Sequence, residues 1–226
     1  MRLVDIDGFE ICPKLFDRAS MLSLADSLQR STIRRSRAGI RNALQIDSVR
    51  TLANEPVLLN FAKDVLGQGA VAIRATLFDK SPRSNWLVVW HQDTPLPLED
   101  RRDTPGWGPW SVKEGVICAH APASALEQIL AIRVHLDDSN ADNGPLRVLP
   151  QTHTMGVLTD DEIHDLANEV SPVECHIPSG GVLLMKPLLV HSSSKTNSQN
   201  ASRRVLHIEY SARVTVENGL RLAIGA

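Results

Sequence analysis

Three side chains that can bind one metal ion constrain the fold of this chain most strongly: His91, Asp93 and His191. Residues 85–93, Asn-Trp-Leu-Val-Val-Trp-His-Gln-Asp, contain β-forming residues in a short apolar run, which predicts a strand. Because side chains alternate across a strand, His91 and Asp93 should point to the same side. His191 ends a second apolar run, residues 182–191, which we expect to be another strand. The fold must bring these distant strand ends together if the three side chains are to act on one ion.

Two histidines and one aspartate leave half of a coordination sphere open, which is the ligand set of non-haem Fe(II) oxygenases. A His-x-Asp pair alone is weak evidence, because a histidine beside apolar residues is more often a hydrogen-bonded core residue. The residues after His191 favour the metal interpretation, since Ser193, Arg203 and Arg204 follow. An arginine on a neighbouring strand can hold a carboxylate through two hydrogen bonds. A ferrous site beside such an arginine suggests 2-oxoglutarate as the cosubstrate.

At four places the sequence resembles the phytanoyl-CoA dioxygenase (PhyH) family of Fe(II)- and 2-oxoglutarate-dependent oxygenases. The matching blocks are residues 90–93, 133–146 and 149–153, and the pair His191 and Ser193 followed by Arg203. Each block alone is weak, but four in the right order are strong, and the similarity runs from residue 7 to about residue 210. One departure is Pro-Gln-Thr-His at 150–153, where the family usually has Pro-Gly-Ser-His. We expect it to alter a turn and to leave the metal ligands untouched.

The resemblance implies a double-stranded β-helix, the jelly-roll or cupin-like fold, mainly β with flanking helices. The order of elements predicts the same fold, because helices come first and many short strands with turns follow. The chain has 226 residues, 42% of them apolar, which fits one dioxygenase domain over residues 1–226 with a full core.

The resemblance also implies the site. Fe(II) would be bound by His91, Asp93 and His191, and 2-oxoglutarate would chelate it with its distal carboxylate on Arg203, assisted by Ser193. With O2 as the other cosubstrate, the expected reaction hydroxylates a small organic substrate and releases succinate and CO2. Halogenating relatives have a small residue in place of the carboxylate, which leaves room for chloride, so Asp93 predicts hydroxylation.

Two further arginines lie on expected strands. Arg74 lies on the apolar strand 71–78, which could pair with the strand of His91. A charged residue there needs a partner, either in a structural ion pair or in bound cosubstrate or substrate, and the resemblance favours the second. Arg133, on the expected strand 126–136, is a candidate for contact with 2-oxoglutarate.

The choice between Arg203 and Arg204 as the carboxylate-binding residue depends on strand register. Along the expected strand 203–216, Arg203 shares a face with Val205, His207 and Glu209, whereas Arg204 lies on the more apolar face. Spacing and the family motif favour Arg203. A slip of one residue would exchange the two arginines.

The remaining segments receive coarser assignments. Apolar spacing predicts helices at 16–28 and 49–66, and a capping pattern at Thr159 predicts one at 159–169. We expect a strand at 7–12 and a tight turn at 137–144. Residues 30–41 contain five arginines, interpreted as a solvated loop or, less favoured, an edge near an anionic ligand. Residues 94–124 are rich in Pro and Gly and are expected to be a long loop that forms a lid or pocket wall and sets substrate selectivity.

Composition limits partners and location. The formal net charge of −2 gives no reason to expect a nucleic-acid partner. We find no apolar stretch long enough to span a membrane and no secretory signal at the start of the sequence. Three widely spaced cysteines, Cys12, Cys118 and Cys175, predict buried thiols in a reducing cytoplasm. The sequence does not indicate the oligomeric state.

Two other functions fit parts of the sequence. A zinc hydrolase could use the same three ligands and a bound water, but it gives Arg203 no role and no general-base motif is evident. A catalytically silent relative could bind a small molecule on the same scaffold, but its ligands would be free to change, and here they are intact. Substrate identity is not encoded in any motif: CoA esters, small metabolites and natural products remain open.

Overall fold

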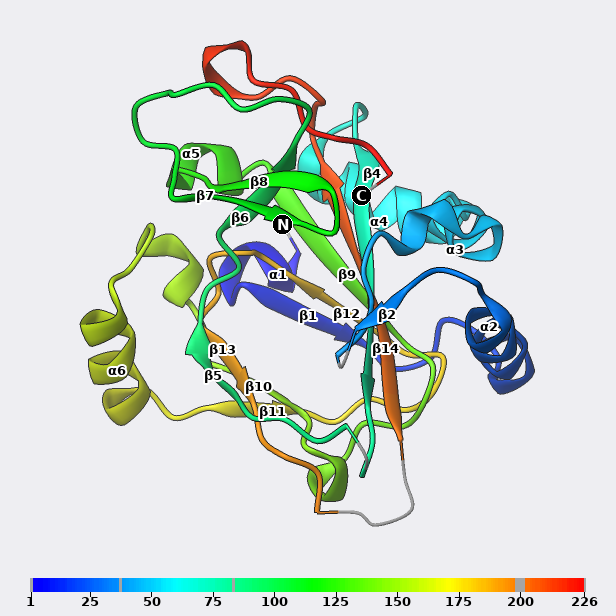
Figure 1. Ribbon diagram of the computed structural model, residues 1–226. Coiled ribbons are helices and arrows are strands. Elements are labelled where there is room, and N and C mark those ends of the chain that lie inside the picture. The colour runs from blue at the N-terminus through cyan, green and yellow to red at the C-terminus, as the bar shows by residue number, and fades with distance from the viewer. Residues whose placement is uncertain (1, 37, 83, 198–201, 226) are drawn as a thin grey trace.

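Two antiparallel β-sheets face each other and form a double-stranded β-helix (Figure 1). The computed structural model describes residues 2–36, 38–82, 84–197 and 202–225. The larger sheet has the strand order β1 (Phe9–Cys12), β12 (Val182–Met185), β9 (Ile129–His135), β14 (Arg203–Ser211), β4 (Val71–Lys80), β3 (Gly39–Ile40) and β2 (Arg35–Ser36). The smaller sheet has the order β11 (Val173–Cys175), β10 (Leu146–Val148), β13 (His191–Ser193) and β5 (Val88–His91). The predicted jelly-roll fold is confirmed.

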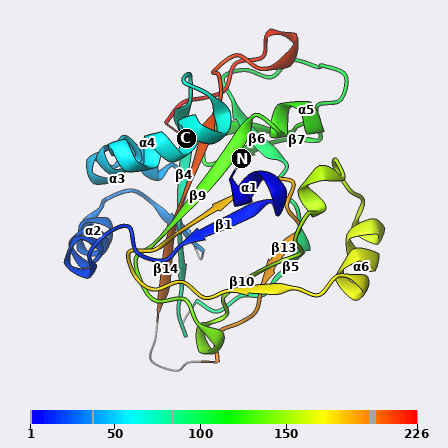
Figure 2. The same ribbon diagram turned by 180° about the vertical axis from the view of Figure 1, so that it is seen from behind.

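The helices lie on the outside of this β-framework. They are α1 (Leu3–Ile6), α2 (Arg18–Arg30), α3 (Asp47–Ala53), α4 (Pro56–Leu66), α5 (Ala123–Leu126) and α6 (Asp160–Glu169). Helices α2, α3 and α4 cover the larger sheet, and α6 lies on the other side of the molecule beside β5 (Figures 1 and 2). The Thr159 hydroxyl and the Glu162 side chain form the expected capping box of α6. No helix in the described ranges has the length and apolarity needed to cross a bilayer.

Alternation along the strands of the larger sheet separates an apolar outer face from a polar inner face. On β14, Leu206, Ile208 and Tyr210 pack with the helices, and the Tyr210 hydroxyl donates to the Ala53 carbonyl oxygen at 2.8 Å. Because the period of a strand is two, the residues between them face the smaller sheet. The outer apolar core therefore fixes the register that turns polar side chains, Arg203 among them, inward.

Two long elements expected from the sequence are each divided in the structure. The helix expected at 49–66 is α3 and α4, because Pro56 starts a new helix and cannot continue the old one. The strand expected at 182–191 is β12 and β13, separated by a turn at Lys186 and Pro187. Because of this division, His191 lies in the smaller sheet, whereas β12 lies in the larger one.

The expectation that residues 94–124 form one long loop is wrong. They contain a third sheet, in the order β6 (Pro95–Leu98), β8 (Val116–His120) and β7 (Trp110–Lys113), followed by α5. Two prolines fit in β6 because it is an edge strand whose partner in this sheet is β8. The β7–β8 turn has φ of 51° at Glu114 and 84° at Gly115, the left-handed geometry of a tight hairpin.

Candidate metal and cosubstrate site

The fold brings His91, Asp93 and His191 together at the open edge of the smaller sheet. His91 and His191 are paired directly across β5 and β13, and their ring centroids are 4.2 Å apart. Asp93 follows β5, and its two carboxylate oxygens lie 3.5 Å from the Nε2 atoms of His91 and His191. One ligand atom from each of the three residues lies within 4.8 Å of the others. Antiparallel pairing of two strand ends thus creates the site.

Backbone carbonyl groups fix the orientation of both histidines. The Nδ1 atoms of His91 and His191 lie 2.8 Å and 2.9 Å from the carbonyl oxygens of Val89 and Leu189. Each imidazole therefore donates from Nδ1 and leaves Nε2 with its lone pair toward Asp93. This is the arrangement in which metal-binding histidines are usually held, with the non-ligating nitrogen bonded to a carbonyl or carboxylate group.

The protonation states suit a cation. Burial lowers the pKa of His191 to about 4, so its imidazole is neutral at physiological pH. Burial alone would raise the pKa of Asp93, but the neighbouring His191 and His91 hold it well below its usual range, so the carboxylate is ionised. For His91, burial lowers the pKa, but the hydrogen bond and attraction between Nε2 and Asp93 outweigh it and raise the pKa, so a metal would displace a proton from this Nε2. The carboxylate and the two Nε2 atoms then form a donor set for a divalent transition metal.

Gln92 ties this corner of the fold to two other segments. Its side-chain Nε2 donates to the carbonyl oxygens of Leu188 at 2.7 Å and Gly156 at 2.9 Å, and its Oε1 accepts from the Leu158 amide at 2.9 Å. The neighbouring Asp93 amide donates to the Pro187 carbonyl oxygen at 2.9 Å. The turn that divides β12 from β13 is thereby joined to the segment carrying Asp93.

A second group of polar side chains lies deeper in the barrel, around Ser193. The Ser193 hydroxyl donates to the Gly144 carbonyl oxygen at 2.9 Å and accepts from Arg203 Nη2 at 3.0 Å and Lys80 Nζ at 2.8 Å. Lys80 and Arg203 are only 1% and 4% exposed. Arg203 lies on the sheet that faces His191, not on a strand next to it, so the expectation of a neighbouring strand is wrong.

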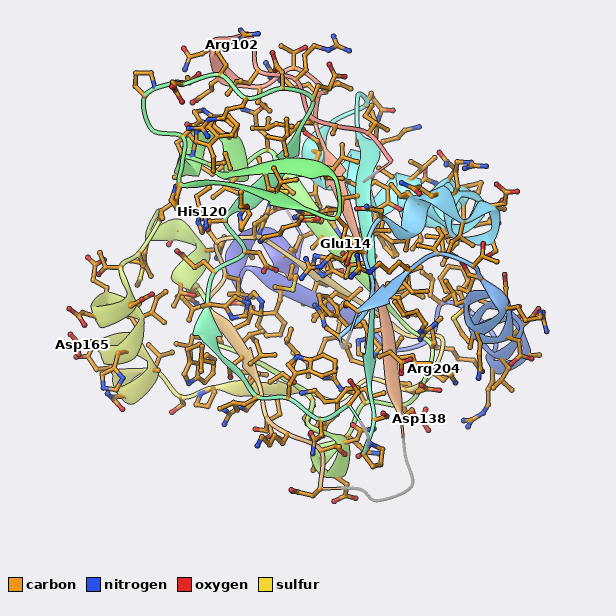
Figure 3. The ribbon with its side chains drawn as sticks, viewed as in Figure 1. Arg102, Glu114, His120, Asp138, Asp165 and Arg204 are labelled. Carbon is orange, nitrogen blue, oxygen red and sulfur yellow. The ribbon has the colours of Figure 1, made fainter. Side chains whose placement is uncertain are left out.

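Arg204 has a different environment. Its guanidinium forms a two-bond ion pair with Asp137, with both N–O distances 2.8 Å. Figure 3 shows Arg204 near Asp138 at the lower end of the larger sheet. The register predicted from the apolar alternation of β14 therefore holds, and Arg203 is the inward-facing arginine of the two.

Arg133 and His135 on β9 complete this inner group. Arg133 Nη1 donates to His207 Nδ1 at 3.0 Å, and its Nε has no hydrogen-bond partner among the described residues. His135 is 1% exposed, and neither of its ring nitrogens has a partner in the same part of the chain. Buried polar atoms are normally paired, so these three nitrogens indicate a ligand that supplies the missing acceptors or donors.

No described carboxylate lies within ion-pair distance of Lys80, Arg133 or Arg203. Burial and the proximity of Arg203 and Arg133 lower the pKa of Lys80 to about 7. Burial and Arg133 lower the pKa of Arg203 to about 9. Buried cations held this close together without anions destabilise the empty protein, so an anionic ligand would gain from binding here.

The inward residues of β4 and β14, called here the inner strip, connect this cationic end to the opposite end of the barrel. The strip consists of four cross-strand pairs: Lys80 with Arg203, Phe78 with Val205, Thr76 with His207, and Arg74 with Glu209. At its far end the Arg74 guanidinium forms an ion pair with the Glu209 carboxylate and donates to the Pro95 carbonyl oxygen at 3.0 Å. The strand of Arg74 pairs with β14 and β3, so the expected pairing with the strand of His91 is wrong.

A cavity of about 150 Å³ lies between the inner strip and the third sheet. The residues that line it are Arg41, Asn42, Arg74, Thr76, Phe78, Asp93, Pro95, Lys113, Val116, Cys118, His207 and Glu209. Residues 94–124 thus supply a pocket wall. Arg41 comes from the arginine-rich segment, whereas Arg35 of that segment pairs with Asp79 on the outside and Arg37 lies outside the described residues.

Lys80 and Glu209 were missed by sequence reasoning. Lys80 lies beyond the expected strand end at residue 78, although its even spacing from Arg74 places it on the same face once the strand is extended. Glu209 was assigned to the face of Arg203 but received no role, because its partner Arg74 lies on a distant segment. Pairing of β4 with β14 was the missing information.

The model of the family "Phytanoyl-CoA dioxygenase (PhyH)" matches residues 25–205. A curated relative, L-proline trans-4-hydroxylase from Streptomyces griseoviridis, is 25% identical over 191 residues. That alignment covers 73% of this chain but only 62% of the relative, so this chain spans less than two thirds of the length of that protein.

Solved structures share the fold at low sequence identity. HygX from Streptomyces hygroscopicus, solved with nickel and 2-oxoglutarate bound, is 19% identical, with a TM-score of 0.63 over 92% of this chain and 83% of its own. EctD from S. alaskensis with bound Fe is 19% identical, with a TM-score of 0.68 over 92% of this chain and 74% of its own. These similarities support the jelly roll, and the family match confirms the predicted resemblance.

Proposed function

Since this chain belongs to the phytanoyl-CoA dioxygenase (PhyH) family, we propose that it hydroxylates a small organic substrate with Fe(II), 2-oxoglutarate and O2. One observation carries the proposal: the triad of His91, Asp93 and His191 shares a barrel with buried cations to which the described residues offer no anionic partner. A metal site alone would fit many reactions. A metal site beside an anion site fits a dicarboxylate cosubstrate.

The residues present fit iron. Two Nε2 atoms oriented by backbone carbonyl groups and one ionised carboxylate are the three-residue donor set of a non-haem ferrous site. Asp93 also lines the cavity, so a metal held by these three residues would lie beside it. HygX and EctD, which share the fold, have been solved with 2-oxoglutarate and with Fe, respectively, which supports the same assignment.

The residues present also fit 2-oxoglutarate. Arg203 and Lys80 would hold its distal carboxylate, and Ser193 keeps both cations in place by accepting a hydrogen bond from each. The unpaired Nε of Arg133 offers a further donor between this end and the metal ligands. Arg74 is committed to Glu209 and Pro95 at the opposite end of the inner strip, which makes it a substrate contact in this proposal.

Bound Fe(II) with 2-oxoglutarate and O2 supplies an oxidant for C–H hydroxylation, with succinate and CO2 as co-products. The protein's own contribution is positional. His91 and His191 bind through fixed nitrogens, Asp93 balances the charge of the ion, and the wall formed by residues 94–124 limits access of water to the cavity.

The test is a binding and turnover experiment. Under anaerobic conditions, purified protein should bind Fe(II) and then 2-oxoglutarate by calorimetry. With O2 and a metabolite library, turnover should consume 2-oxoglutarate and release succinate in equal amounts. His91→Ala should abolish both iron binding and turnover, whereas His176→Ala, at an exposed histidine paired with Glu174, should leave them unchanged.

Three results would contradict the proposal or a part of it. Hydrolysis that needs zinc but no 2-oxoglutarate would indicate the alternative metal enzyme. Absence of Fe(II) and 2-oxoglutarate binding in the wild type would indicate a silent relative. Halogenation of a substrate in the presence of chloride would contradict the role assigned to Asp93.

A further inference from the structure

The ion pair of Arg74 and Glu209 is an unusual feature of the cavity wall. Two hydrogen bonds join the groups, and Glu209 is only 3% exposed. Removing two charges from water is costly, and apolar residues of similar size often give equal or greater stability. Stability alone therefore does not explain an ion pair at this position. The location of the pair suggests a role in ligand binding, because both side chains line the cavity that Asp93 also lines.

The cavity wall carries an excess of positive charge once Asp93 is assigned to the metal. The remaining charged residues that line the cavity are three cations, Arg74, Arg41 and Lys113, and one anion, Glu209. Glu114 offsets Arg41 only weakly, at 3.9 Å, from the tip of the β7–β8 hairpin shown in Figure 3. A ligand that carries a carboxylate would match this wall. Glu209 in turn offers an acceptor for one cationic group.

The size and position of the cavity limit the ligand further. About 150 Å³ is less than the ~300–1,000 Å³ typical of pockets for drug-sized molecules. The Arg74–Glu209 pair lies at one end of the inner strip, and the Lys80–Arg203 pair lies at the other. The two charged ends are therefore separate, and a ligand at Arg74 and Glu209 does not compete with a dicarboxylate at Arg203.

We propose that the substrate is a small amino acid-like zwitterion, with its carboxylate on the Arg74 side of the wall and its ammonium group on Glu209. This inference rests on the proposed function and names its substrate class. The Arg74–Glu209 pair matches such a ligand because it presents one charge of each sign side by side. Arg41 and Lys113 at the rim attract the carboxylate during entry.

The first experiment compares matched ligands on the wild-type enzyme with Fe(II) and 2-oxoglutarate. The common L-amino acids are screened for stimulation of succinate release and for anaerobic binding by calorimetry. The most effective amino acid is then compared with its carboxamide and with the acid that lacks the amino group. Loss of either charge should lower kcat/KM at least tenfold, mainly through KM.

The second experiment removes the pair without leaving a lone buried charge. The double variant Arg74→Met/Glu209→Met should keep Fe(II) and 2-oxoglutarate affinity within about twofold, and should lose at least tenfold in amino-acid binding and stimulation. The matched control is Arg204→Met/Asp137→Met, which removes a two-bond ion pair from the outer side of the barrel. That control should retain full stimulation.

The outcomes separate this inference from the proposed function. If the wild type binds Fe(II) and 2-oxoglutarate but only amides, acyl-CoA esters or no library member at all stimulates it, the zwitterion is excluded and the oxygenase assignment stands. Stimulation retained in Arg74→Met/Glu209→Met shows that the pair is structural, which also overturns the inference. Loss of Fe(II) and 2-oxoglutarate binding in the wild type contradicts the proposed function itself.

Discussion

Lys80 is a buried lysine whose pKa the surrounding protein shifts strongly. It is 1% exposed and close to two guanidinium groups, and burial together with Arg203 and Arg133 lowers its pKa from 10.5 to about 7. A bound carboxylate favours the charged ammonium and raises that pKa again. Binding of 2-oxoglutarate above pH ~7 must therefore take up a proton, since the free protein has lost it and the complex regains it.

The first prediction follows from this shift. The Kd for 2-oxoglutarate should increase as pH rises above ~7, approaching tenfold per pH unit, while below that pH Lys80 contributes no pH dependence. Calorimetry in buffers of different ionisation enthalpy should detect the proton uptake. Lys80→Met should weaken binding at neutral pH and remove this slope, and a slope that persists in the variant would assign it to another group. Lys14→Met, at an exposed lysine, is the control.

Gln151 carries the departure from the family's Pro-Gly-Ser-His motif. Its φ is 69°, in the left-handed region that glycine adopts without strain, and the following residues form a short 3₁₀ helix, Thr152–Thr154. The turn therefore keeps the glycine-like backbone conformation with a side chain present. Within the described residues its side chain makes one long hydrogen bond, from Nε2 to Asp7 Oδ1 at 3.4 Å, so little compensates for the strain.

Gln151→Gly should accordingly raise the free energy of unfolding by up to about 1 kcal/mol, because relief of left-handed strain exceeds the entropy that glycine adds to the unfolded chain. Urea unfolding measures the change, and iron binding should not change. A loss of stability would show that the contact with Asp7 outweighs the strain.

Residue chemistry and local spacing were enough to nominate the metal ligands and Arg203. They could not decide between a structural and a functional role for Arg74, since that depends on its cross-strand partner. Glu209 is that partner, and it lies on a segment far along the chain. Ionic partners between distant strands depend on register and sheet order, which no local pattern contains.

At the scale of elements, Gln92 links the segment of His91 and Asp93 at the end of β5 to the turn before β13, which carries His191. Its side chain hydrogen-bonds the buried carbonyl group of Leu188 in the turn after β12, and the half-buried carbonyl group of Gly156 and amide of Leu158. These contacts join the segment of Asp93 to the segment of His191. Gln92 is therefore a positioning residue, and it faces away from the ligands as strand alternation predicts.

Gln92→Leu should lower the free energy of unfolding by about 1–3 kcal/mol, because it leaves the buried Leu188 carbonyl group unpaired and removes hydrogen bonds from the half-buried Gly156 and Leu158. It should also weaken Fe(II) binding by roughly 10–100-fold, the usual effect of losing a residue that orients metal ligands. Equilibrium unfolding of the metal-free protein and metal titration separate the two effects. Iron affinity equal to that of the wild type in the folded variant would contradict the positioning role.

Elements were predicted well where one face is apolar and poorly where strands are short. The alternation of apolar and polar residues along β9 and β14 correctly predicted which face of each strand is apolar, since these apolar residues pack on the helices. The third sheet was mistaken for a loop because β6 contains two prolines and β7 is only four residues long. Edge strands tolerate such residues, so composition alone does not reveal them.

At the scale of the whole molecule, the buried cations make stability depend on ligands. Lys80, Arg133 and Arg203 repel each other in the empty barrel, and an anion that binds only the folded state stabilises it. With Fe(II) present, 2-oxoglutarate at 100 times its Kd should add about 2.7 kcal/mol to the free energy of unfolding. Thermal unfolding should show a raised midpoint.

The control for that experiment is a ligand of the wrong length. Acetate has one carboxylate and cannot span from the metal to Arg203, so at equal ionic strength it should stabilise the protein much less. Equal stabilisation by acetate would show that the cations respond to any anion and do not form a dicarboxylate site.

The jelly roll as a whole was predictable, because helix-first order, many short strands and four motif blocks all indicate it. The division of 182–191 between the two sheets was not, although the site depends on it. The turn that contains Lys186 and Pro187 separates β12 in the larger sheet from β13, with His191, in the smaller sheet. The direction of the chain after such a turn depends on the packing of the complete molecule.

Along the inner strip, Lys80 lies six residues after Arg74 in β4, which corresponds to about 20 Å at strand spacing. The cavity is lined at Arg74, Thr76 and Phe78, whereas Lys80 and Arg203 are closed off from solvent by the part of the chain that the structure describes. We expect a substrate held at Arg74 to obstruct the route to Arg203. 2-Oxoglutarate should therefore bind before the substrate, and succinate should leave after the hydroxylated product. Initial-rate kinetics should show this compulsory sequence.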